Sequence, residues 1–294
     1  MLTDVEAATP ALCRLQLGSE LRQLRLSAGI KGAQVVKKLI WSPSKLTRLE
    51  TGENTVVEPS DVVALCSIYR ADLETTDRLQ SYAAVTKTKK DWWLSPNYRP
   101  VIGPGLKAFL DLEATSVAVQ TYQAEFIPGL LQTEAYVRVV HRWAHASLSA
   151  DDVDRHVAIR MMRQEVLSRS ISPLRFTAII SEGVLRRPVG ESPIMRDQLT
   201  HIVDLVESRP NVRVQVLPFR AGDHAGMDGS FVMLQFPEKS ALKPMVYLEN
   251  LADAWVKRAD RDVERYADAV SDLQALAPGP QESLSMIKEA IKEH

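Results

Sequence analysis

The residues best suited to chemistry lie in the segment IKGAQVVKKLIWSPSKLTRLETG, residues 30–52. Ser42 followed by Pro43 indicates a helix start, because serine caps a first turn and proline needs no N–H at the first helical position. Leu46 and Leu49 have helical spacing and predict the inward face, which leaves hydroxyl and cationic side chains outside. Such a helix suits the major groove of DNA.

Within this segment we expect Lys45 and Arg48 to reach base edges, since arginine is the best partner for guanine. Lys31, Ser42 and Ser44 are expected near phosphate or sugar. The full set of predicted DNA-binding residues is Lys31, Gln34, Ser42, Pro43, Ser44, Lys45, Thr47 and Arg48.

The charge around this segment is uneven, although the whole chain has a net charge of only −1. Residues 14–48 hold eight basic residues and one acid, a net charge of +7, whereas residues 50–77 hold seven acids and one arginine, a net charge of −6. The basic part suits phosphate, and the acidic part is expected to be repelled from it. The alternative is that both are solvated helix faces.

Four further helices are expected to hold the predicted DNA-reading helix. An apolar stripe from Leu17 to Ala28 precedes Gly29, which is expected to end the first helix. The other predicted helices span residues 32–39, 59–69 and 73–86. The helix at residues 59–69 offers as core candidates Val62, Val63, Leu65, Cys66 and Ile68.

Residues 15–70 resemble the lambda-repressor-like, or XRE-type, helix-turn-helix, and WSPSKLTRLETG is close to the form common in actinobacterial regulators. The resemblance implies an all-α five-helix DNA-binding domain in which Arg25 pairs with Glu50. Gly32 stands where the family often has a phosphate-binding glutamine, and Ile40 replaces the usual turn glycine. Pro43 replaces a side chain that often reads a base.

The segment at residues 87–103 is rich in proline, glycine, aromatic and charged residues and predicts a linker. Trp92 and Trp93 are expected to pin it to the second domain; stacking on nucleic acid is the alternative. We therefore predict a DNA-binding domain at residues 1–86 and a mixed α+β domain at residues 104–294. Helices are expected in the latter at residues 106–113, 133–146, 151–169, 192–207, 261–277 and 281–292, and strands at 117–122, 174–180, 212–217, 230–236, 245–248 and 254–256.

This second half resembles the DUF5753 domain that follows a helix-turn-helix in actinobacterial regulators. The stretches that carry the resemblance are YQAEFIPGLLQTEAYVRVV, RHVAIRMMRQEVLSR, SEGVLRRPVG, PNVRVQVLPFRAGDHAGMDGSFVMLQF and VYLEN. The resemblance implies a regulator, often encoded beside a small partner protein of the DUF397 type. It implies no particular ligand.

Catalytic and metal sites receive little support from the sequence. His141 and His145 have the i, i+4 spacing of two ligands on a helix, but no third ligand accompanies them. Arg186 and Arg187 could clasp an anion, although a salt bridge at a helix end is favoured. No hydrolase, zinc-protease, P-loop or dinucleotide motif is present, and we expect no enzyme activity, cofactor or metal.

The loop AGDHAGMDG, residues 221–229, is the strongest candidate for a ligand or partner site in the second domain. Three glycines allow close backbone approach, and Asp223, His224 and Asp228 lie within six residues. A structural hairpin loop is the favoured interpretation. Glu249, at the end of a predicted strand, is a weaker candidate.

Composition indicates a cytoplasmic protein without a membrane span. No run of 18 apolar residues and no apolar N-terminal segment is present, and Cys13 and Cys66 are expected to be buried thiols. The predicted function is a sequence-specific transcriptional regulator that binds double-stranded DNA as a homodimer. The alternative is an antitoxin-like module that binds a small partner; an enzyme acting at residues 221–229 is a third hypothesis.

Overall fold

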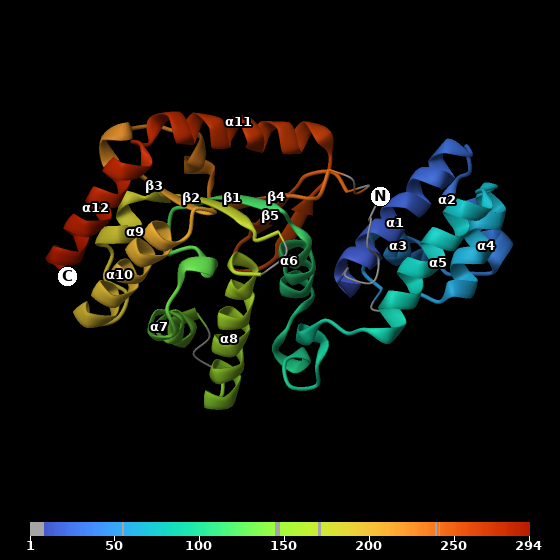
Figure 1. Ribbon diagram of the computed structural model, residues 1–294, viewed down its shortest axis with the longest axis horizontal. Coiled ribbons are helices and arrows are strands. Elements are labelled where there is room, and N and C mark those ends of the chain that lie inside the picture. Colours follow the sequence, from blue (N-terminus) through green and yellow to red (C-terminus); the bar gives the residue numbers. More distant parts are fainter. Residues whose placement is uncertain (1–8, 55, 145–147, 170–171, 239, 241) are drawn as a thin grey trace. The chain divides into compact units, whose positions relative to one another are not determined.

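A computed structural model describes residues 9–294 except 55, 145–147, 170–171, 239 and 241. The chain forms two compact units (Figure 1). The first contains the chain up to Arg99 together with Lys107–Thr115 and Phe236–Lys243. The second contains Pro100–Leu106, Ser116–Gln235 and Pro244–His294. The first unit thus gains segments from beyond the predicted linker.

The N-terminal part of the first unit, up to Thr88, is built from five helices, as predicted from the sequence. They are α1 (Pro10–Ser27), α2 (Gly32–Leu39), α3 (Pro43–Thr51), α4 (Pro59–Tyr69) and α5 (Leu73–Thr88). Three of these helix starts have a side-chain cap: Thr9, Ser42 and Asp72 accept a backbone N–H of the first turn of α1, α3 and α5. Gly52 ends α3 with φ 75°, a conformation that favours glycine.

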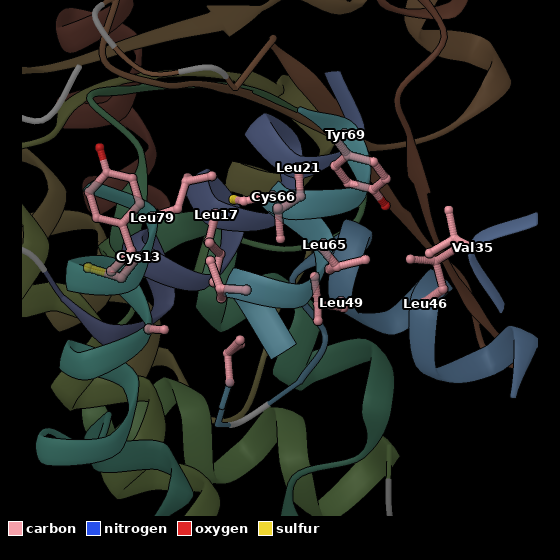
Figure 2. Packing of buried hydrophobic residues seen from close by; sticks show 14 of the residues in the cluster. Cys13, Leu17, Leu21, Val35, Leu46, Leu49, Leu65, Cys66, Tyr69 and Leu79 are labelled. Carbon is pink, nitrogen blue, oxygen red and sulfur yellow. The ribbon is translucent and has the colours of Figure 1, made fainter. Parts of the chain in front are cut away.

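The core of this unit gathers apolar side chains from all five helices (Figure 2). Leu17 and Leu21 of α1 meet Leu46 and Leu49 of α3 in this cluster, and Leu65 joins from α4. Val63 was predicted as a core residue, and this prediction is wrong, since its side chain is 42% exposed. Helix α4 buries Val62, Leu65, Cys66 and Tyr69, which follow the i, i+3, i+4, i+7 stripe that excludes Val63.

The second unit is built on one six-stranded sheet in the order β3-β2-β1-β4-β5-β6. Strands β1, β2 and β3 pair in parallel, and β4, β5 and β6 join as an antiparallel half. The strands are β1 (Ala118–Gln123), β2 (Arg175–Ser181), β3 (Val212–Leu217), β4 (Phe231–Gln235), β5 (Met245–Glu249) and β6 (Ala254–Lys257). The mixed α+β prediction is confirmed.

Helices cover this sheet from both sides: α11 lies along one face, and α7, α8 and α10 lie on the other (Figure 1). The helices after the first unit's five are α6 (Pro104–Thr115), α7 (Glu134–Ala144), α8 (Ala150–Arg163), α9 (Glu182–Arg186), α10 (Ser192–Ser208), α11 (Asp260–Leu276) and α12 (Pro280–Glu293). Helix α8 ends earlier than predicted, and residues 164–167 form a 3-10 turn. At the end of this turn, the Asn211 side chain donates to the Leu167 carbonyl at 3.0 Å, so this carbonyl has a partner without a further helical turn.

Candidate DNA-binding surface

The N-terminus of α3 is exposed and well capped. The Ser42 hydroxyl accepts the Lys45 backbone N–H at 3.2 Å and lies 3.0 Å from the Ser44 hydroxyl. Thr47 donates its hydroxyl to the Pro43 carbonyl at 3.1 Å. The first turn therefore holds two exposed serine hydroxyls at the N-terminal end of a helix, where the helix dipole favours an anion such as phosphate.

Burial of one side of α3 determines which side chains remain outside. Leu46 and Leu49 are 4% and 2% exposed, so the helix is fixed by its inner face. Thr47 and Arg48 are exposed, as are Ser42, Pro43 and Ser44. The outer face thus presents hydroxyls and the Arg48 guanidinium, which is the chemistry required for contacts with phosphates and base edges.

Arg25 and Glu50 join α1 to the end of α3. The Arg25 Nε and Nη2 atoms donate to the two carboxylate oxygens at 2.6 and 2.8 Å, and Nη1 donates to the Ile30 carbonyl at 3.1 Å. The hydrogen bond to Glu50 raises the pKa of Arg25. This planar pair with two hydrogen bonds fixes the direction of α3, and both charges are engaged in holding the fold.

Lys45 already has two partners inside the first unit. Its ammonium lies 2.8 Å from the Asp61 carboxylate and 3.9 Å from the centre of the Trp41 ring. Its side chain is 36% exposed, so the pair remains open to solvent. Sequence reasoning missed Trp41 and Asp61 here, although the i, i+4 spacing of Trp41 and Lys45 could have indicated the first.

The turn between α2 and α3 carries backbone strain at Ile40. This residue has φ 56° and its side chain is 92% exposed. A β-branched residue is disfavoured in the left-handed region, by about 1–2 kcal/mol. The turn therefore keeps a positive φ at this position, and the isoleucine that replaces the usual glycine adopts it under strain.

The predicted residues of α2 have different surroundings. Gln34 accepts the Lys31 backbone N–H through its side-chain oxygen at 2.8 Å, and so it caps the start of α2. The Lys31 side chain is exposed, as are Lys37 and Lys38. The structure thus gives Gln34 a capping contact and leaves the lysines facing solvent.

Only part of the +7 charge of residues 14–48 is available at the surface. Arg14 is 1% exposed, and Arg25 and Lys45 form ion pairs with Glu50 and Asp61. The expected separation into a basic and an acidic face is therefore wrong at these positions, because the two signs meet in ion pairs. The cations that remain exposed are Arg22, Lys31, Lys37, Lys38 and Arg48.

Arg14 belongs to a buried charge cluster in the first unit. Its guanidinium donates to Asp91 and to Asp111, each at 2.8 Å. Asp111 also accepts the indole N–H of Trp93 at 3.1 Å and the Lys107 ammonium at 2.7 Å. Trp93 thus anchors the segment after α5 on a residue of α6 that lies in this same unit. Burial raises the pKa of Asp91, and Arg14 opposes that rise.

Both cysteines are buried free thiols, as expected. Burial raises the pKa of Cys13 to about 12 and also raises the pKa of Cys66. Since the thiolate is the reactive form, neither residue has the environment of a catalytic nucleophile.

The loop at residues 221–229 has internal contacts that account for its unusual composition. The His224 Nδ1 atom accepts the Gly226 N–H at 3.1 Å, and its ring lies edge-on to Tyr122 at 5.7 Å. A side chain at Gly226 would overlap the Tyr122 ring. Asp228 faces Arg265 at 3.4 Å rather than His224. The hairpin interpretation is wrong, since β2 and β1 separate the two strands that this loop connects.

The remaining candidates of the second unit have structural partners. Arg186 pairs with Glu182 and Glu293, and Arg187 pairs with Glu125, so the salt-bridge prediction is confirmed. The sequence suggested His141 and His145 as two possible metal ligands on one helix. His145 lies outside the residues that the structure describes. His141 is buried, and its ring stacks on His156 with centres 4.9 Å apart. Glu249 is exposed at the end of β5.

Comparison with known families identifies two successive parts of the chain. A family model described as a helix-turn-helix domain matches residues 16–79, which contain α2, α3 and the surface just described. A second model, described as a domain of unknown function (DUF5753), matches residues 106–289. Because this second match covers more than half of the chain, the protein belongs to the DUF5753 family. No curated protein and no solved structure matches it.

These matches confirm both resemblances at the level of a helix-turn-helix followed by DUF5753. A DNA-binding regulator is the class of protein that the helix-turn-helix indicates. No helix within the described part of the chain combines the length and apolar character that a membrane span requires.

Proposed function

We propose that the chain is a sequence-specific transcriptional regulator that reads double-stranded DNA with α3. The observation that carries the proposal is the capped, exposed N-terminus of α3, with Arg48 outside and Leu46 and Leu49 locked in the core. Helix-turn-helix proteins place this part of the second helix in the major groove. The proposed contacts are Arg48 and Lys45 at base edges, and Ser42, Ser44 and Lys31 near phosphate or sugar.

In this proposal the start of α3 and Arg48, further along the same helix, have different tasks. The hydroxyls and N–H groups at the start of α3 fix the register on the backbone, while Arg48 supplies sequence information. Lys45 must exchange Asp61 for DNA, since one ammonium cannot serve a base edge while it is held in the ion pair. Gln34, Pro43 and Thr47 then line the approach, and the Arg25–Glu50 pair holds α3 in place.

The DUF5753 part is proposed to supply dimer contacts and the response to a partner protein or ligand. A homodimer places two α3 helices on two half-sites about one DNA turn apart. A single DNA-binding domain that contacts its half-site mainly through Arg48 and a few phosphate contacts has modest affinity for DNA. Pairing two such domains raises that affinity. Support for the division comes from the helix-turn-helix and DUF5753 matches, which occupy different parts of the chain.

The test is selection of DNA sequences from a random pool by the full-length protein, followed by binding measurements on the selected site. Arg48→Ala is expected to weaken binding by about 1–3 kcal/mol and to relax the preference at one base position. Arg213→Ala is the matched control, because Arg213 is also an exposed arginine but lies on β3. If Arg48→Ala binds the site as tightly and as selectively as the wild type, the proposed reading role of α3 is wrong.

A further inference from the structure

The two edges of the six-stranded sheet differ in how their backbone groups are satisfied. At the β3 edge, the Val216 backbone N–H donates to the Ser283 hydroxyl of α12 at 3.0 Å, and the Gln215 side-chain amide donates to the Pro278 carbonyl at 3.1 Å. Helix α12 and the turn before it therefore cover this edge. At the β6 edge, the one partner that the described residues give the outward Ala254 N–H is the carboxylate of the preceding residue, Asp253, at 2.8 Å. An edge of this kind can pair with another strand.

The register of β5 and β6 identifies which backbone groups of β6 point outward. Asn250 donates its N–H to the Asp253 carbonyl at 3.0 Å, and Glu249 lies opposite Ala254. Hydrogen-bonded pairs alternate along an antiparallel ladder. Trp255 and Lys257 therefore bond to β5, whereas Ala254 and Val256 direct their N–H and C=O groups away from the sheet.

The side chains of β6 alternate in the same way. Ala254 and Val256 are half-buried, and Asp253, Trp255 and Lys257 are exposed on the other face. The Trp255 side chain is 42% exposed, and Leu251 in the preceding turn is fully exposed. This short strand thus offers an aromatic ring between an acid and a base, spaced two residues apart on one face.

We infer that β6 pairs antiparallel with β6 of a second copy of this chain, on a two-fold axis at Trp255. In this register Ala254 lies opposite Val256 of the other copy, so the outward groups of both strands form four backbone hydrogen bonds. Trp255 lies directly opposite Trp255 of the other copy, at a non-hydrogen-bonded position of the ladder, where the two side chains are close. Asp253 lies opposite Lys257 of the other copy, and the two-fold axis repeats this pair, which gives two cross-strand ion pairs.

Other two-fold registers lose this complementarity. Centring the pair on Ala254 places Asp253 opposite Trp255, and centring it on Val256 places Lys257 opposite Trp255, so neither register brings the charges together. The chosen register also releases the Asp253 carboxylate for the ion pair, because the Ala254 N–H then donates to a backbone carbonyl of the other copy.

The inference deepens the proposed function by locating the dimer contact that pairs two DNA-reading helices. Its biological role rests on that proposed function.

A cysteine crosslink tests the register directly on the full-length protein without DNA. Non-bonded antiparallel pairs have Cα atoms about 4.5 Å apart, within the range that a disulfide spans. Trp255→Cys is expected to form a disulfide-linked dimer under mild oxidation. Leu251→Cys is the matched control: it is more exposed, but lies opposite Ala259 of the other copy and is expected to crosslink at least tenfold less. Equal crosslinking of the two variants overturns the inference.

The oligomeric state provides the second readout, measured by analytical ultracentrifugation. Val256→Pro removes an outward N–H and spares the bonds to β5, so it is expected to give a monomer with an unchanged circular dichroism spectrum. Lys257→Glu is expected to weaken the dimer at least tenfold, and Asp253→Lys together with Lys257→Glu is expected to restore it. A monomeric wild type, or a dimeric Val256→Pro, overturns the inference.

These measurements are independent of DNA reading. If the proposed function is wrong, the wild type forms a dimer but selects no DNA sequence. If the β6 pairing is wrong, Val256→Pro remains a dimer, while Arg48→Ala still loses binding to the selected site.

Discussion

Two charged groups in the first unit have similar chemistry and opposite exposure. Arg14 lies between Asp91 and Asp111 with side chains 1–6% exposed, whereas Lys45 faces Asp61 with side chains 36% and 23% exposed. A buried pair cannot be broken without leaving a charge in a poorly solvated site. A half-exposed pair costs little to open. The first group therefore fixes structure, and the second can exchange its partner for DNA.

The largest effect is expected from Arg14→Met, which leaves the buried carboxylates of Asp91 and Asp111 without the guanidinium that joins them. The loss in the free energy of unfolding is expected to be about 3–5 kcal/mol, measured by urea unfolding followed through tryptophan fluorescence. Arg22→Met is the matched control, because Arg22 is exposed on the same helix, and its effect is expected to stay within about 0.5 kcal/mol. Equal effects of the two variants would remove the distinction between a structural and a surface arginine.

The same substitution at Lys45 is expected to act on DNA rather than on the fold. Lys45→Met should weaken binding to the selected site by about 1–3 kcal/mol. Its unfolding free energy should change by no more than about 1 kcal/mol, since a partly exposed ion pair and a cation–π contact contribute little. Titration of labelled DNA and urea unfolding of one preparation give both numbers. A large loss of stability with unchanged DNA binding would assign Lys45 to the structural group.

The smallest effect is expected from Asp61→Asn, which releases Lys45 from its ion pair. DNA affinity is expected to rise severalfold, by up to about 1 kcal/mol, because Lys45 no longer gives up a partner on binding. Asp77→Asn is the control, as Asp77 is an exposed acid on α5 and removes the same charge. The informative result is the difference between the two variants at one salt concentration; identical gains would mean that Asp61 acts only through net charge.

Much of the architecture follows from local sequence patterns. The Ser42–Pro43 start and Gly52 end predict α3, and Leu46 and Leu49 predict its buried side, because capping and helical periodicity depend on neighbouring residues alone. The alternation of residues 174–180 likewise predicts β2.

Contacts between distant residues were beyond the reach of this reasoning. The Arg14 cluster joins residues 77 and 97 positions apart, and Asp61 reaches Lys45 from another helix. The sheet order that separates β3 from β4 depends on tertiary pairing and not on the composition of the loop between them. The charge count of residues 14–48 consequently overstated the basic surface.

A double-mutant cycle between Arg48 and the DNA tests the central claim most directly. Each guanine of the selected site is replaced in turn by 7-deazaguanine, which lacks the N7 acceptor that an arginine binds in the major groove. At one position per half-site the substitution is expected to weaken wild-type binding and to leave Arg48→Ala unaffected, so that the two losses are not additive. Additive losses at every guanine would contradict the account.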